Sequence, residues 1–431
     1  MTTAATRQGS PPGAPGAPGA LGALDGLVVL DLTQMLAGPY ASMMLADQGA
    51  RVIKIEPPGG DQTRRNGPHL EGAVRPEQRG YGAYFGSINR NKESVVLDLK
   101  HEAGRQALLR LVRQADVLVE NYRVGVMDRL GLGYDVLAAE NPRLVYATLR
   151  GFGDPRSGAS PYAQWPAYDP VAQAMGGIMG ITGPRRGGAP TKIGPGVGDI
   201  VPAMFLAYGI AAACWRAQRT GQGQFVDVGM VDAVLAVCER LVFQYGVTGK
   251  APVPEGNGHP LLCPFGLFPA ADGYVSLGVP NDRFWALLVA RMGRPELQHD
   301  PRFASNDARV AHREAVEEIV AAWTRGQTKQ QLAQALGGDI PFGPVFDAGD
   351  IFADPHFRVR QMLVEVEQPG AARPLTVAGT PVRMSATPGG VRRRAPMVGE
   401  HTERTLADFG FSPAEIAALQ PATALPSSPT R

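Results

Sequence analysis

The chain has 431 residues, with 42 basic and 40 acidic side chains and a formal net charge of +2. Its length exceeds the roughly 250 to 300 residues at which one hydrophobic core stops growing, so two domains are expected. The balanced charge argues against a nucleic acid or a membrane surface as partner. The three cysteines lack C-x-x-C spacing and the seven histidines lack paired ligand spacing, so we expect no metal site and a reduced compartment.

Both ends of the chain have compositions that do not fold. Residues 1–25 are rich in Gly, Pro and Ala, and residues 421–431 in Pro and Ser, so we expect two disordered tails. The first tail has neither the apolar core of a signal peptide nor the Arg-rich pattern of a transit peptide. The longest apolar run ends at Arg216 and Arg219, short of the roughly 18 to 20 residues of a membrane span. These features predict a soluble, cytoplasmic protein.

Alternating apolar segments in the first half predict a doubly wound α/β sheet with helices on both faces. The expected strands are residues 27–32, 51–56, 94–99, 117–120, 144–148 and 224–228. The expected helices are residues 39–49, 103–114, 126–130, a long helix that opens at Asp199, and 232–245.

The second half begins with a segment in which Gly and Pro are dense, residues 249–271, which predicts a linker or loop. A smaller α+β domain should follow over residues 272–345, opening with a hairpin turn at Asp272-Gly273. Its expected helices are residues 282–292, 310–324 and 328–336. Beyond it we expect strands at 364–367 and 375–377 and a last helix at 402–409.

Several common catalytic and cofactor motifs are absent from the sequence. Residues 33–39, which follow the first strand, hold one glycine, Gly38, where a dinucleotide fingerprint needs three. Neither G-x-x-x-x-G-K-[ST] nor G-x-S-x-G occurs. The pattern therefore argues against a nicotinamide or flavin cofactor, a phosphate-binding loop and a serine nucleophile.

Asp199 closes a glycine-rich run, 194–198, and opens the long apolar stretch. One interpretation is a helix N-cap, because an Asp side chain accepts hydrogen bonds from first-turn N–H groups. The other is a nucleophile, since a helix N-terminus favours the ionised carboxylate that nucleophilic attack requires. The segment alone leaves both interpretations open.

Basic residues gather at Asn89–Lys92, with Lys100, Arg123 and Arg129 close behind on neighbouring strand ends and loops. They form either a solvated sheet rim or a phosphate-binding cluster at the carboxyl ends of parallel strands, where open α/β sheets bind ligands.

Ten short segments, in this order along the chain, together resemble the class III CoA-transferases, a family that also includes the α-methylacyl-CoA racemases. The segments are Gly26–Leu32, Ala37–Pro39, Gly49–Glu56, Asn89–Lys92, Val119–Tyr122, Tyr168–Ala174, Gly198-Asp199, Gly221–Gln224, Ile340–Val345 and Gly399–Thr402. They span residues 26 to about 415, nearly the whole folded chain.

The resemblance implies a Rossmann-like large domain built from both chain ends, residues 26–248 and 346–420, with the smaller domain between them. It also implies a homodimer whose subunits interlock. In the family, the aspartate of the Gly-Asp step is the nucleophile, here Asp199. It attacks an acyl-CoA thioester to give a mixed anhydride and then carries CoA as an aspartyl thioester. Coenzyme A is thus expected as substrate, with no permanently bound cofactor, and the other partner is a small carboxylic acid.

The family resemblance also implies the residues that contact CoA and a glycine-rich loop, Gly256, Asn257 and Gly258, that covers the nucleophile. The implied contacts are Leu36, Ala37, Leu97, Asp98, Leu99, Lys100, Asn121, Tyr122, Arg123, Arg129, Pro166, Ala167, Tyr168 and Asp169. Of these, Lys100, Arg123 and Arg129 are expected on phosphates and Leu97 beside the adenine.

Three positions depart from family members. Leu36 and Pro166 replace a glutamine and a lysine of formyl-CoA transferase, which argues against formyl and oxalyl substrates. Tyr168 replaces the second acid/base histidine of the racemases, and a phenol with a pKa near about 10 is a poor proton acceptor. We therefore expect transfer of CoA from succinyl-CoA or a similar short acyl-CoA.

The alternatives are a racemase or a silent subunit of a hetero-oligomer. Arg64, Arg65 and Lys192 are candidates to bind the distal carboxylate of a dicarboxylic acid.

Overall fold

The structure, a computed structural model, describes residues 22–419. The two predicted tails fall outside these residues, except for residues 22–25. Those four residues belong to the fold, because the backbone N–H of Leu24 donates to the Gln48 carbonyl at 3.0 Å. The predicted limit of the first tail is therefore too far along the chain.

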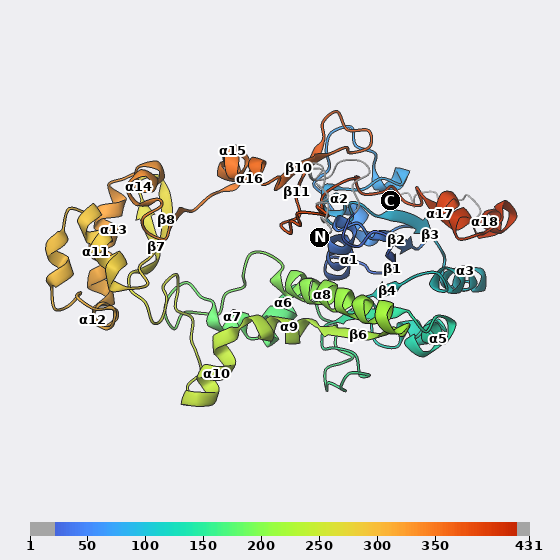
Figure 1. The fold of residues 1–431 in the computed structure, drawn as a ribbon, viewed down its shortest axis with the longest axis horizontal. Coiled ribbons are helices and arrows are strands. Elements are labelled where there is room, and N and C mark those ends of the chain that lie inside the picture. Colours follow the sequence, from blue (N-terminus) through green and yellow to red (C-terminus); the bar gives the residue numbers. More distant parts are fainter. Residues whose placement is uncertain (1–21, 420–431) are drawn as a thin grey trace, which may run out of the picture. The chain divides into compact units, whose positions relative to one another are not determined.

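A six-stranded parallel sheet forms the centre of the first half (Figure 1). Its order, β3-β2-β1-β4-β5-β6, is typical of doubly wound dinucleotide-binding sheets. The strands are β1 (Val28–Asp31), β2 (Arg51–Glu56), β3 (Glu93–Val96), β4 (Val117–Glu120), β5 (Val145–Arg150) and β6 (Gln224–Gly229). The predicted α/β class with a parallel sheet is confirmed. The winding direction reverses between β1 and β4, so the carboxyl ends of these two strands open a crevice.

Helices from both ends of the chain pack on one core with this sheet. Apolar residues of α3 (Glu102–Val112) and α5 (Tyr134–Glu140) share it with Leu30, Ile53 and Leu118 of the strands. Leu406 of α17 (Thr402–Asp408) and Ile416 of α18 (Pro413–Leu419) complete it. The helix α18 was not predicted, since the last helix was expected at 402–409.

The longest helix, α8 (Val197–Thr220), packs against α1 (Ala37–Asp47), β5 and β6. Within residues 22–419 it is the one helix that could cross a membrane by length and composition, and 44% of its most apolar window is buried. It is longer than the apolar run in the sequence suggested, because its last turns include Arg216 and Arg219. Its packing on the sheet is that of a core helix.

Two predicted helices are each divided in two. The segment expected at 232–245 forms α9 (Met230–Val237) and α10 (Glu239–Thr248), because Cys238 leaves the helical region with a ψ of 60°. The segment expected at 310–324 forms α12 (Asn306–Ala311) and α13 (Arg313–Arg325), separated by His312. Apolar periodicity continues across both breaks, so it carries no signal for them.

By internal contacts the described chain forms two compact units. Unit 1 holds the residues up to Gly176, then Gly194–Cys238 and those from His356 on, and unit 2 holds Gly177–Ile193 and Glu239–Pro355. Unit 1 also contains the remaining short elements α2 (Ala83–Ile88), α4 (Val126–Arg129), α6 (Asp169–Met175), α16 (Pro355–Val359, from its second residue), β10 (Leu363–Val366) and β11 (Leu375–Ala378), the last two antiparallel.

Unit 2 is built on an antiparallel sheet of β7 (Phe265–Ala270), β8 (Gly273–Gly278) and β9 (Phe342–Pro344). A hairpin joins β7 and β8 as predicted, but its two-residue turn is Ala271-Asp272, one residue earlier than predicted, since Ala270 pairs with Gly273. The helices of this unit are α7 (Ile178–Ile181), α10, α11 (Asp282–Arg291), α12, α13, α14 (Lys329–Leu336) and α15 (Ala348–Ala353). The segment predicted as a linker contains β7, so the unit begins earlier than the predicted small domain.

Candidate functional site

A pocket of about 250 Å³ opens where the winding direction of the sheet reverses. Its wall comes from the segments that follow β1, β4 and β5, from residues 163–168, and from Asp199 and Met230. The lining residues are Gln34, Met35, Ala37, Asn121, Tyr122, Arg123, Val124, Leu149, Arg150, Gly151, Ala163, Gln164, Trp165, Pro166, Ala167, Tyr168, Asp199 and Met230. Doubly wound sheets bind ligands at this position, so the pocket is the candidate site.

The loops after β1 and β4 are tied to each other across the crevice. The Gln34 backbone N–H donates to the Asn121 side-chain oxygen, and the Asn121 amide donates back to the Gln34 carbonyl, both at 2.8 Å. Gly38 lies so close to Thr33 that a Cβ on it would be 2.4 Å from the Thr33 Cβ. Gly38, the second residue of α1, therefore permits the tight turn from β1 into this helix.

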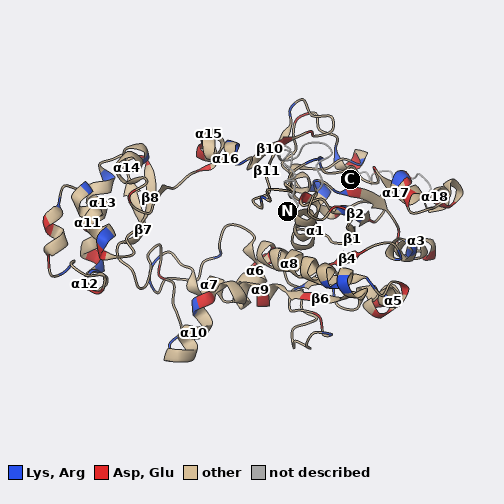
Figure 2. Cartoon of the chain, in the orientation of Figure 1, with Lys and Arg blue, Asp and Glu red and all other residues tan. Residues whose placement is uncertain are grey.

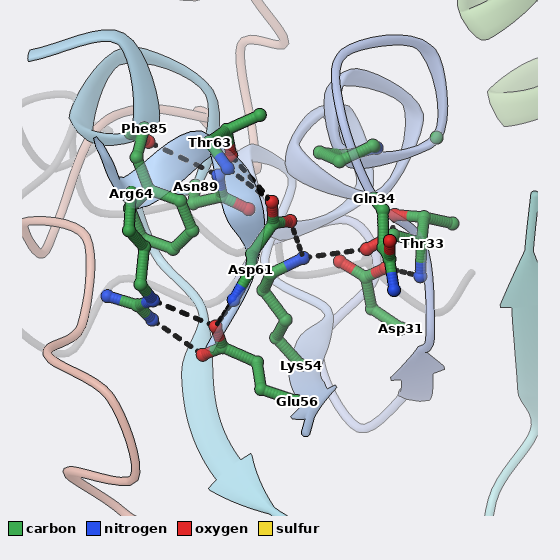
Figure 3. Close-up of polar contacts among 12 residues, drawn as sticks. Asp31, Thr33, Gln34, Lys54, Glu56, Asp61, Thr63, Arg64, Phe85 and Asn89 are labelled. Carbon is green, nitrogen blue, oxygen red and sulfur yellow. Dashed lines mark hydrogen bonds and ion pairs between the residues drawn. The ribbon is translucent and has the colours of Figure 1, made fainter. Parts of the chain in front are cut away.

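A buried network of charges supports the loop after β1 (Figure 3). Lys54 donates to the Thr33 carbonyl at 2.8 Å and pairs with Asp61 at 3.0 Å. Lys92 pairs with Asp31 at 2.9 Å. Burial raises the pKa of Asp31, but the positive charges of Lys92 and Lys54 outweigh it and lower the pKa to about 2. Asp31 is therefore ionised at neutral pH and holds the start of the loop through the Thr33 hydroxyl and backbone N–H.

Both interpretations of the basic segment Asn89–Lys92 are wrong, because its side chains are buried and paired. Arg90 forms a salt bridge with Asp47 at 2.7 Å, and Asn91 also donates to Asp47. Lys92 is occupied by Asp31. These side chains form neither a solvated rim nor a free phosphate-binding group.

Arg64 is also buried, with its guanidinium forked onto the Glu56 carboxylate at 2.5 and 2.8 Å (Figure 3). It lies over the Phe85 ring at 3.9 Å from the centroid. The prediction that it binds a substrate carboxylate is therefore wrong. Of the other two candidates, Arg65 is exposed in unit 1 and Lys192 is exposed in unit 2.

Asp199 is the third residue of α8, and Gly196 occupies the N-cap position. The N-cap interpretation of Asp199 is therefore wrong. Asp169, the first residue of α6, instead accepts the Gly198 backbone N–H at 2.9 Å. Within residues 22–419 no hydrogen bond or ion pair reaches the Asp199 carboxylate.

The surroundings of Asp199 disfavour its charged form. Burial, and then the negative charge of Asp169, raise the pKa of Asp199 to about 6. The sequence had suggested the opposite direction, because a helix N-terminus favours the ionised form. A half-buried carboxylate without a cation partner, at the wall of a pocket, is suited to act as nucleophile or base.

The structure brings about half of the predicted site residues together at this pocket. Ala37, Asn121, Tyr122, Arg123, Pro166, Ala167 and Tyr168 line it with Asp199. Leu36, Leu97, Asp98, Leu99, Lys100, Arg129 and Asp169 lie outside its lining.

Leu97 is 1% exposed within the core of unit 1, so the expected face for an adenine ring is covered. Lys100 and Arg129 are exposed. The loop Gly256–Gly258 lies in unit 2, where it lines a separate pocket of about 930 Å³.

Sequence reasoning missed several residues near Asp199. Gln34, Met35 and Arg150 line the pocket, and Arg150 carries the cation at the carboxyl end of β5. Its guanidinium pairs with Glu120 at 2.5 Å. Tyr84 on α2 is also close enough for the Asp199 charge to act on it, since burial and then Asp199 raise the pKa of Tyr84. Arg150 is the last residue of β5 but lies two residues beyond the strand predicted at 144–148, so the predicted bounds left it out.

No group of three or more His, Cys, Asp or Glu side chains within residues 22–419 is placed to hold a metal ion. The polar groups of the pocket are one carboxylate, three amides, two phenols, an indole N–H and two guanidinium groups. This set suits an anionic organic ligand better than a cation.

The chain matches the family model of CoA-transferase family III over residues 24–402. It therefore belongs to this family and is a CoA-transferase. It is 46% identical over 389 residues to succinyl-CoA:mesaconate CoA-transferase of Haloarcula hispanica, covering 90% of this chain and 96% of that one. It is 42% identical over 364 residues to acetyl-CoA:oxalate CoA-transferase of Acetobacter aceti, covering 82% and 89%. A crystal structure of a CAIB/BAIF family protein from Brucella suis has a TM-score of 0.79 and 36% identity, covering 90% and 99%.

Proposed function

We propose that this CoA-transferase moves CoA from succinyl-CoA, or a similar short acyl-CoA, to a small carboxylic acid through covalent intermediates on Asp199. The observation that supports this most is the position of Asp199. Its carboxylate lies at the wall of the pocket without a described cation partner, beside the loops after β1 and β4. Such a carboxylate can bond to a substrate carbonyl without first breaking an ion pair.

The reaction begins when an Asp199 oxygen attacks the thioester carbonyl. A C–O bond forms, the C–S bond breaks, and CoA leaves as a thiolate. The thiolate attacks the Asp199 carbonyl of the mixed anhydride, so the donor acid leaves with one oxygen from Asp199. The acceptor carboxylate then attacks the aspartyl-CoA thioester, and the thiolate attacks the acceptor carbonyl of the new anhydride. Each of these two half-reactions exchanges one carboxylate for one thiolate, so no oxidant, reductant or water is consumed.

Exposed cations near the carboxyl ends of the strands are suited to bind the CoA phosphates. Arg123 lines the pocket. Lys100 lies on the segment after β3 and Arg129 lies on α4, and both side chains are exposed. Guanidinium groups bind phosphate oxygens through paired hydrogen bonds. The other implied CoA contacts that line the pocket, and closure of Gly256–Gly258 over Asp199 to exclude water, are part of the proposal.

The acceptor is proposed to be a short acid, and a dicarboxylate fits the two curated relatives best. One of them carries mesaconate in its name and the other oxalate, and their CoA donors are succinyl-CoA and acetyl-CoA. The direct test supplies succinyl-, acetyl- and formyl-CoA to the purified chain with a panel of mono- and dicarboxylic acids. We expect the highest kcat/KM with succinyl-CoA. Loss of all transfer by the chain alone would favour the silent-subunit alternative.

The activity should depend on pH through Asp199. The ionised carboxylate is the nucleophile, so kcat/KM for acyl-CoA is full above the pKa of Asp199 and is lost as the pH falls through about 6. Below pH 5 the slope should approach one decade per pH unit. A profile that stays flat down to about pH 4.5, near the ordinary pKa of a carboxyl group, would contradict an essential Asp199 in this environment.

Tyr168 argues against the racemase alternative. It lines the pocket, and the family resemblance implies that it replaces the racemase histidine. We expect 2-methylacyl-CoA in deuterated water to show no α-deuterium exchange at a rate near that of CoA transfer, because a phenol is a poor base at neutral pH. Replacing Tyr168 by His should permit slow exchange, since imidazole titrates near pH ~6.5. Rapid exchange by the unmodified chain would establish the racemase instead.

A homodimer is proposed as the assembly. Large apolar side chains are exposed on α8 and α9 of unit 1: Met204, Phe205, Tyr208, Trp215, Leu235 and Val237. Most of α8 carries no charged side chain, and basic residues gather near its C-terminal end (Figure 2). An apolar surface of this kind is typical of a protein interface. The cytoplasm is the proposed location.

A further inference from the structure

Asp169 connects two helix N-termini beside the candidate nucleophile. It is the first residue of α6 and is 9% exposed. One carboxylate oxygen accepts the Gly198 backbone N–H at 2.9 Å and the Gln173 side-chain amide at 2.8 Å. Gly198 directly precedes Asp199, so Asp169 fixes the backbone that carries the nucleophile.

The close approach of the two helices depends on a glycine. A Cβ on Gly198 would lie 2.5 Å from the Asp169 carbonyl oxygen and 3.0 Å from its Cα. Any larger residue at position 198 would therefore push the first turn of α8 away from α6. The Gly-Asp step is thus required by the contact with Asp169 as well as by access of substrate to Asp199.

An anionic group stabilises the N-terminal turn of a helix, but here that group also lies beside a second carboxylate. The charge of Asp169 acts on Asp199 in the direction that opposes ionisation, after burial itself. A carboxylate that holds its proton more tightly is also more reactive toward a carbonyl once it is ionised. The position of Asp169 therefore affects the reactivity of Asp199 as well as its placement.

We propose that Asp169 is a positioning residue of the transfer reaction, which holds the first turn of α8 and places a negative charge that makes the Asp199 carboxylate a stronger nucleophile. The inference rests on the proposed role of Asp199. Asp169 itself forms no bond to substrate, and it acts through the Gly198 N–H and through its charge.

Two neutral variants that keep a hydrogen-bond acceptor test this proposal, Asp169→Asn and Asp169→Ser. In both, the midpoint of the pH profile of kcat/KM should fall below about 6, but it should stay above the ordinary carboxyl value of about 4, because burial, the larger cause of the raised pKa, remains. The rate at pH 8 should fall by about three- to tenfold, because the nucleophile becomes less basic. Asp169→Glu keeps the charge, so its midpoint should remain near that of the unmodified enzyme even if its rate falls.

The matched control is Asp227→Asn. Asp227 is a carboxylate at β6 that accepts the Asp154 backbone N–H at 2.9 Å and lies outside the lining of the candidate site. Its replacement should leave the midpoint unchanged. If the midpoint is unchanged in Asp169→Asn and Asp169→Ser, the electrostatic role of Asp169 is overturned. If Asp227→Asn shifts the midpoint by as much as Asp169→Asn does, the shift is not specific to Asp169 and the role is overturned as well.

Mass spectrometry of the acylated enzyme separates this inference from the proposed function. If an acyl group is found on Asp199 while the pH profiles of the Asp169 variants match that of the unmodified enzyme, the inference alone fails. If no acyl group is found on Asp199 in any variant, the proposed function fails.

Discussion

Replacing Asp199 by Ala or Asn should lower kcat by at least about a thousandfold, because the change removes the group proposed to form both covalent intermediates. Binding of CoA should change by less than about threefold, since the exposed cations Lys100, Arg123 and Arg129 remain. Steady-state kinetics and calorimetric titration with CoA measure the two effects. Asp199→Asn is the sharper variant, because it keeps the shape of the side chain and removes the charge on which its nucleophilicity depends.

The matched control for this loss is Asp116→Asn. The Asp116 carboxylate accepts the Val28 backbone N–H at 2.9 Å, where β1 begins, at the opposite end of that strand from the candidate site. Its replacement should leave kcat within about threefold in enzyme that remains folded. Turnover by Asp199→Asn above a few per cent of the unmodified rate would assign the reaction to another nucleophile.

Arg64→Met should destabilise the protein by about 3 to 5 kcal/mol, the largest effect on stability that we expect. The change leaves the fully buried Glu56 carboxylate without its guanidinium partner. It also removes the hydrogen bond from Arg64 to the Pro396 carbonyl at 2.9 Å, which ties the C-terminal segment to the sheet. Urea unfolding curves of the two proteins at pH 7 measure the difference.

The pH dependence of this effect follows from Glu56. Burial raises the pKa of Glu56, but Arg64 lowers it further, so the pKa lies below its ordinary value. In the unmodified protein this pair contributes stability above the unfolded pKa of about 4.3, and the contribution is lost as the pH falls through the lower folded pKa. In Arg64→Met the carboxylate becomes easier to protonate. The difference between the two proteins should therefore shrink in acid.

An exposed ion pair provides the comparison. Arg113 pairs with Glu140 at 2.8 Å, and the two side chains are 56% and 32% exposed. Arg113→Met should cost less than about 1 kcal/mol, because water screens the pair and solvates the remaining carboxylate. The double change Glu56→Gln with Arg64→Met should recover part of the loss, since it removes the unpaired charge. Equal losses in Arg64→Met and Arg113→Met would contradict a stabilising role for the buried pair.

The sheet could be predicted from the sequence because each strand contains several apolar residues close together, many of them Val or Ile. The strands at 51–56 and 117–120 have the predicted bounds. The strand expected at 94–99 ends at Val96, since the Asp98 side chain accepts the Lys100 N–H and turns the chain. Turns made by one side chain are local events that apolar periodicity does not record.

The charges of the site were harder to predict because their partners are distant in sequence. Lys92 looks like a surface residue within a polar segment, yet its partner Asp31 lies on β1. Asp169 precedes Asp199 by 30 positions, so its effect on the pKa of Asp199 depends on the packing of α6 against α8. Pairings of this kind follow from the tertiary fold, whereas the Gly198-Asp199 step could be identified through its resemblance to a family pattern.

The most direct test of Asp199 as the covalent carrier follows one oxygen atom. In the proposed reaction the acceptor carboxylate leaves one of its oxygens on Asp199 in each turnover, because the thiolate cleaves the second anhydride at the acceptor carbonyl. Trypsin cuts after Lys192 and Arg216, and the peptide between them contains Asp199 as its one acidic side chain. The enzyme turns over with acceptor acid labelled with ¹⁸O and is digested in ordinary water. We predict ¹⁸O on Asp199 in this peptide, and a peptide of unchanged mass after many turnovers would contradict a covalent Asp199 intermediate.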